Sequence, residues 1–148
     1  MILISNSSGS SHEAFNDLAK LYLIRDLLIS KLANGIEVTL TQAEKKVDKL
    51  IGEPDLLKLI KMLDKFFWVK DRDSIRMVRS YRHRLSLFVE RTVGLEEYGR
   101  LLSFNKEELE NELNNIRNKL LRNKGMFSIL EAQVDMLLKW FRRGSEYG

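Results

Sequence analysis

The chain has 148 residues, of which 44% are apolar and 31% charged, and its net charge is +4. This length and composition fit one folded domain with an apolar core and argue against a disordered chain. The absence of cysteine excludes a disulfide scaffold, a thiolate nucleophile, a zinc finger and an iron–sulfur cluster held by this chain.

The apolar runs of the sequence are only a few residues long, which is too short to span a membrane. The opening residues 1–4 lack the charged and apolar regions of a signal peptide. We therefore expect no membrane association and a cytoplasmic location.

Residues 1–10, which include a Ser- and Gly-rich stretch, are expected to form a flexible tail ahead of a single helical domain over residues 11–148. The predicted helix starts carry capping-box spacings, in which Ser, Thr or Asn precedes Glu by three residues. These occur at Ser10, Thr41, Asn105 and Ser128. Pro54 occupies the favoured first position of the third helix, and Gly52 ends the second.

The predicted helices follow one another along the whole domain. Their ranges are 12–33, 42–51, 55–66, 73–92, 95–103, 106–123 and 129–143. Apart from one possible short extended piece between the first two helices, no segment alternates apolar and polar residues with period two. The fold is therefore predicted to be all-α, as a single compact domain of six or seven helices.

The basicity of the chain is local. Residues 70–91 hold seven Lys or Arg against three Asp or Glu, a surplus of four that equals the net charge of the whole chain. On a helix, Arg72, Arg76, Arg79 and His83 fall within about 60° of one another, opposite the apolar side chains. Like charges at this spacing repel. We interpret the row as a surface for nucleic acid or nucleotide phosphate; a solvated face with ion pairs to neighbouring helices is the alternative.

The start of this helix has the properties of an anion site. Asp71 or Asp73 is expected to cap it, which places Arg72 and Arg76 beside its free N–H groups. A guanidinium holds two phosphate oxygens at once. Trp68 precedes the helix and is either a platform for stacking a base or part of the core.

A second basic run contains Arg117, Lys119, Arg122 and Lys124, with no acid between Glu112 and Glu131. The charges of this run are spread more evenly around their helix than those of the row at residues 72–83. The run either extends an electrostatic track for nucleic acid or forms a solvated face.

The residues needed for independent catalysis are missing from the sequence. Only two histidines are present, and they have no metal-ligand spacing. No phosphate-binding glycine motif and no nucleophile elbow occurs. Asp71 and Asp73 have the spacing of a two-metal site but lie at a helix start, where capping is the preferred interpretation. We expect a protein that is not an enzyme and needs no metal or other cofactor.

Several short motifs resemble the C-terminal domain of the large subunit of archaeal and eukaryotic DNA primases. That family has a Pro before a short helix, then an R-x-x-x-R-M motif and a further basic residue eight positions on. Here these are Pro54, Arg72 to Met77, and Arg84. The Asn-Ile-Arg of the family is similar to residues 115–117. The resemblance covers about half of the chain.

The family's four cysteines, which hold a 4Fe–4S cluster, have no counterpart here. In this respect the chain resembles the third primase subunit of some thermophilic archaea, the PriX family. The resemblance implies partnership with a catalytic small subunit and a large subunit. It also implies that Arg72, Arg76 and Arg84 bind single-stranded template DNA and the 5′-triphosphate of the initiating nucleotide or of the primer 5′ end.

Two other interpretations remain open. Residues 79–85, followed by residues 104–109, are similar to the arginine-rich helix of the GINS subunits of the replicative helicase, which implies a scaffold whose arginines pair with acids of a partner. A small DNA-binding regulator would instead place the basic helix in the major groove of a duplex.

Overall fold

The computed structural model describes residues 2–33, 38–67, 87–88 and 91–147, with side chains described over 12–33, 38–65, 87–88 and 91–139. Within these ranges the regular structure is helical and contains no strand, which confirms the predicted all-α fold. The elements are α1 (Ile2–Ala33), α2 (Leu40–Ile51), α3 (Pro54–Phe67), α5 (Leu95–Leu102), α6 (Lys106–Leu121), the 3₁₀ turn η1 (Lys124–Met126) and α7 (Phe127–Tyr147). Most of the helix predicted at 73–92 lies outside the described residues.

Helix α1 begins at Ile2, well ahead of the predicted start at residue 12. Ser10 therefore lies inside the helix, and its predicted role as an N-cap is wrong. Residues 2–10 continue the helix, although Ser and Gly have low helix propensity. Helical geometry and mobility are separate properties, so the flexibility of this segment stays a prediction.

The ends of α2 and α3 follow from local chemistry. The N-cap of α2 is Thr39, whose hydroxyl accepts from Gln42 N while the Gln42 side chain accepts from Thr39 N. The predicted cap at Thr41 is thus wrong by two residues. Gly52 ends α2 in the left-handed conformation at φ 69°, which glycine adopts without steric cost. Pro54 opens α3 as predicted.

The C-terminal helices start close to their predicted positions. Asn105 caps α6 in a capping box with Glu108, which confirms that prediction. Helix α7 begins at Phe127, directly after η1, so Ser128 lies in its first turn instead of before it.

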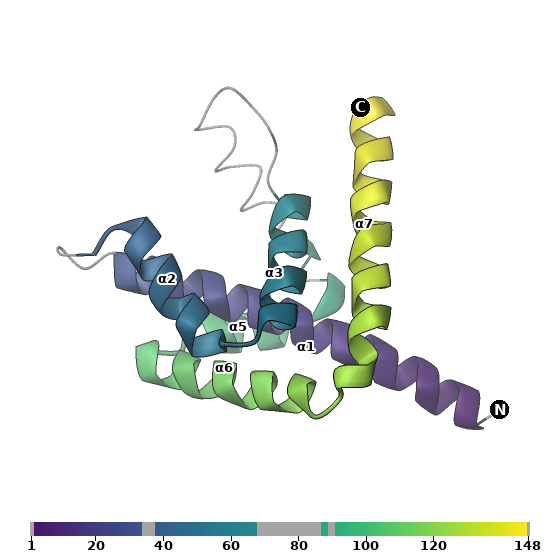
Figure 1. Cartoon of the computed structure of the whole chain (residues 1–148), viewed down its shortest axis with the longest axis horizontal. Coiled ribbons are helices and arrows are strands. Elements are labelled where there is room, and N and C mark those ends of the chain that lie inside the picture. The colour runs from purple at the N-terminus through teal and green to yellow at the C-terminus, as the bar shows by residue number, and fades with distance from the viewer. Residues whose placement is uncertain (1, 34–37, 68–86, 89–90, 148) are drawn as a thin grey trace.

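The core forms around α1, against which α2, α3, α6 and α7 pack (Figure 1). From Leu18 to Ile29 most side chains of α1 are buried, and they lie on all sides of the helix. A helix that is apolar around its circumference belongs in the interior. The partner helices contribute one buried stripe each, including Val47 of α2, Leu59 of α3 and Leu113 of α6.

Arg25 is a buried charge on this apolar helix. Its Nε donates to Asp48 Oδ1 at 2.9 Å and its Nη2 to Glu44 Oε1 at 3.0 Å, both on α2. Burial by itself would lower the pKa of Arg25, but the hydrogen bond and the charges of these two carboxylates outweigh burial and raise it. The guanidinium therefore stays protonated and fixes α2 against α1.

We predict that Arg25→Met lowers the free energy of unfolding by about 2–3 kcal/mol, because it leaves the partly buried Asp48 carboxylate of α2 without its cation. Chemical denaturation at neutral pH measures the difference. Lys45→Met, at an exposed position of α2, is the control and should change stability little. Equal stability of the two variants would contradict the role given to Arg25.

Candidate functional site

The sequence-predicted binding residues fall into two groups. Arg117, Lys119 and Arg122 lie on or next to α6 and have described side chains. The others lie outside the described residues: Trp68, Arg72, Arg76, Arg79, His83 and Arg84. The structure therefore shows the surroundings of the second basic run directly. For the first basic run, at residues 70–91, it shows the helix that precedes it in the sequence, α3.

Arg117 closes the C-terminal end of α2. Its Nη1 donates to the carbonyl oxygen of Leu50 at 3.1 Å and approaches that of Ile51 at 3.5 Å. The last carbonyls of a helix have no partner within the helix, so a guanidinium placed there satisfies them. Arg117 therefore has a structural role, and contact with nucleic acid stays a prediction for it.

Lys119 is held between two acids of α1. Its Nζ lies 2.9 Å from Asp17 Oδ2 and 3.1 Å from Glu13 Oε1, and Asp17 is buried. The hydrogen bond to Asp17 raises the pKa of Lys119. Its charge is thus largely neutralised within the fold, which leaves little of it for an outside anion.

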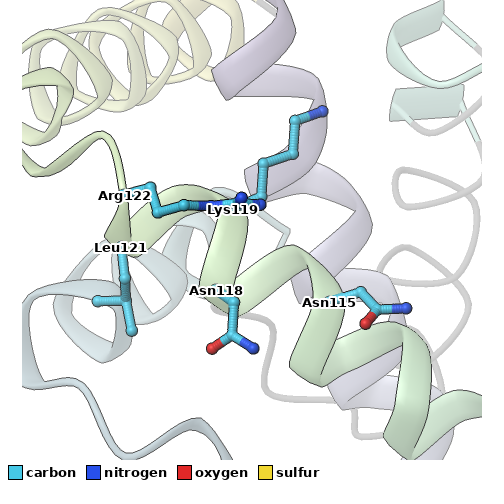
Figure 2. A pocket seen from close by; sticks show the side chains of 5 residues that line it. All are labelled: Asn115, Asn118, Lys119, Leu121 and Arg122. Atoms are coloured by element: carbon cyan, nitrogen blue, oxygen red, sulfur yellow. The ribbon is translucent and has the colours of Figure 1, made fainter.

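Arg122 differs from its two neighbours. It is exposed at the C-terminal end of α6 and makes no salt bridge within the described part of the chain. It borders a shallow surface hollow lined also by Asn115, Asn118, Lys119 and Leu121 (Figure 2). Figure 2 shows the two amide groups on the same side of α6. Asn118 Oδ1 already accepts from Arg117 Nη2 at 3.2 Å, so Arg122 is the cation at this hollow that has no salt bridge to a described residue.

A third basic surface, which was not predicted from the sequence, lies on α3. Lys58, Lys61 and Lys65 are exposed and line one hollow together with Pro54, Leu57 and Met62. We call these three lysines the α3 lysine face. Lys58 forms a salt bridge of 3.1 Å with Glu131 of α7, whereas Lys61 and Lys65 form none with any described residue. Their spacing of three and four residues places them on one side of the helix, and this spacing was the signal in the sequence.

The described residues hold no cluster of three or more His, Cys, Asp or Glu that would bind a metal ion. Within the same residues, no helix has the length and apolar character needed to cross a membrane. The two hollows are lined by cations together with amide or apolar side chains, and cations and amides are groups that donate hydrogen bonds to anions.

Comparisons of the chain with protein-family models, curated proteins and solved structures find no match. An all-α fold alone selects no function, because helical folds host many unrelated activities. The functional assignment therefore depends on the residues of this chain and on the resemblance of its motifs.

We predict that Lys119→Met lowers the free energy of unfolding at neutral pH by about 1–2 kcal/mol, because it leaves the buried Asp17 carboxylate without its cation. The raised pKa of Lys119 means that its contribution is complete below the ordinary value of 10.5 and is lost as the pH rises through the higher folded value. Denaturant titrations of the wild type and of Lys119→Met should therefore give free energies of unfolding that differ at neutral pH and become equal at strongly alkaline pH.

The matched control for Lys119→Met is Arg122→Met, which removes an exposed cation three residues further along. It should leave stability unchanged within about 0.5 kcal/mol. If both variants keep wild-type stability at neutral pH, Lys119 has no structural role and its charge is available to a ligand.

Proposed function

We propose that this chain is a non-catalytic subunit of an archaeal DNA primase. It binds the single-stranded template and the 5′-triphosphate of the initiating nucleotide or primer, and it presents them to a separate catalytic small subunit alongside the large subunit. The proposal places the protein in the cytoplasm, with no cofactor of its own. Nothing in this role requires a nucleophile or a general base from the chain.

The observation that carries the proposal is the basic segment at residues 70–91, together with the spacing of Arg72, Arg76 and Arg84 that resembles the primase family. Seven cations within 22 residues exceed what three acids neutralise. A guanidinium suits phosphate because two of its N–H groups meet two oxygens at once, which a lysine cannot do. The all-α fold is compatible with the resemblance, which implies a helical domain.

The proposed contribution to primer synthesis is positioning. A triphosphate held next to the template raises the effective concentration of the first nucleotide at the catalytic subunit, and such a gain is entropic in origin. Extension of an existing primer has less need of this help, because the primer is already paired with the template. Initiation is therefore the step on which the chain should act.

The second candidate is a helical scaffold subunit of the replicative helicase, similar to the GINS subunits. The observation in its favour is that two of the three described basic candidates, Arg117 and Lys119, have their partners inside the fold. If the arginines of residues 70–91 are likewise paired with acids, in this chain or in a partner, the basic segment stabilises an assembly instead of binding nucleic acid. A helical DNA-binding regulator, which would prefer duplex DNA, is a third possibility.

We predict that Arg72→Ala and Arg76→Ala each weaken binding of a 5′-triphosphate primer end by about 1.5–3 kcal/mol, the range for charge-assisted hydrogen bonds. In the reconstituted primase, de novo initiation should fall while extension of a pre-formed primer survives. Lysine at either position should restore binding only in part, because it lacks the two-pronged contact.

Arg122→Ala is the control for general loss of charge and should cost less, mainly lowering the salt dependence of binding. Wild-type initiation rates in both the Arg72→Ala and the Arg76→Ala complex would remove the main support for a primase role and favour the scaffold.

A further inference from the structure

We infer that the α3 lysine face, Lys58, Lys61 and Lys65, is a contact surface for the backbone of single-stranded nucleic acid. This inference rests on the proposed function and adds a second binding element to it, on residues that the primase-like motifs do not include. Three features of the face support it: its geometry, its charge, of which only Lys58 has a described salt bridge, and the partly apolar hollow that the lysines line.

The three lysines form a short row along the helix axis. Positions 58, 61 and 65 fall within about 60° of one another around an α-helix and span about 10 Å along it. At about 3.4 Å per nucleotide of a stacked strand, this distance covers about three intervals between successive phosphates, or about four phosphates. Three ammonium groups can therefore meet successive phosphates of one strand.

The charge of the face is only slightly offset by the rest of the fold. The one salt bridge found for it within the described residues joins Lys58 to Glu131, and both side chains are about half exposed, at 58% and 48%. Such surface pairs contribute little. Lysines three and four residues apart repel one another, and a bound polyanion would remove this repulsion. The contrast with α6 is clear, because Lys119 there is held by a buried acid.

The hollow between these lysines favours a single strand over a duplex. Its remaining lining is apolar and comes from Pro54, Leu57 and Met62. A sugar or an unpaired base can pack on such a surface while its phosphates meet the lysines, whereas a duplex keeps its bases inside the stack. An acidic peptide is the other ligand with this chemistry.

Continuity along the chain favours the nucleic acid over the peptide. Helix α3 ends at Phe67, and the segment with the surplus of four positive charges begins at Lys70. The lysines and arginines thus follow one another closely in the sequence. A long polyanion can engage both groups of cations, whereas a short acidic peptide would engage only one of them.

The test compares the full-length wild-type protein with four double variants by fluorescence anisotropy on a 20-nucleotide oligothymidylate over a range of salt. Lys61→Ala/Lys65→Ala removes the two lysines of the face that lack a described partner. Lys45→Ala/Lys49→Ala is the matched control, because these exposed lysines of α2 have the same four-residue spacing and line neither described hollow. Arg72→Ala/Arg76→Ala tests the proposed function separately.

The α3 variant should bind the oligonucleotide on the order of tenfold more weakly, and its salt slope should fall by about 1.4, or about 0.7 for each phosphate that is no longer neutralised. The α2 control should stay within about twofold of the wild type. Lys61→Arg/Lys65→Arg should restore binding, because it keeps both charges. Thermal melts should be the same for the wild type and all lysine variants, because every substituted lysine is exposed.

The alternative outcomes distinguish a failure of this inference from a failure of the proposed function. If the α3 variant matches the α2 control while the Arg72/Arg76 variant loses affinity, the inference is wrong and the proposed function stands. If wild-type protein does not bind the oligonucleotide, the proposed function fails and the inference with it. If Lys61→Ala/Lys65→Ala loses as much affinity for a duplex of the same length as for the oligonucleotide, the preference for single strands is wrong. If Lys61→Ala/Lys65→Ala binds the oligonucleotide as the wild type does but binds a polyglutamate peptide more weakly, the ligand of the face is an acidic protein partner instead.

Discussion

Helix α1 is buried on all sides through its middle, so its two buried charges, Asp17 and Arg25, each require an opposite charge from a neighbouring helix. Arg25 takes Glu44 and Asp48 from α2, and Asp17 takes Lys119 from α6. Hydrophobic burial alone is non-directional. These ion pairs add the directional contacts that set how α2 and α6 lie on the central helix.

The basic residues of the candidate surfaces, where the structure describes them, are of two kinds. Arg117 and Lys119 are committed to the fold, one to helix carbonyls and the other to a buried acid. Arg122 and the α3 lysine face are exposed on its surface. Counting basic residues along the sequence treats these groups alike, although only the second has charge to offer a ligand. A basic run on a helix is thus an ambiguous signal until its tertiary partners are known.

Fold class and several helix ends could be predicted because local chemistry decides them. Asn105 with Glu108, Gly52 and Pro54 act within one turn of their own positions. The start of α2 was harder, since Thr39 with Gln42 and Thr41 with Glu44 offer two overlapping capping patterns. The early start of α1 was missed because Ser and Gly lower helix propensity without forbidding a helix.

The site was less predictable than the fold. Lys119 meets Asp17 and Glu13 from the opposite end of the chain, and spacing within α6 carries no information about such a contact. The α3 lysine face was overlooked for the opposite reason: three lysines on one helix side are an ordinary pattern, and only the hollow they share with Pro54, Leu57 and Met62 sets them apart.

The central claim is that the chain binds single-stranded nucleic acid through its phosphates. The most direct measurement is equilibrium binding of the wild-type protein to a single strand and to a duplex of the same length, across a range of salt. The account predicts tighter binding of the single strand, with affinity that falls linearly with salt on logarithmic axes. Negligible affinity for both would contradict it in favour of a scaffold, and preference for the duplex would contradict it in favour of a DNA-binding regulator.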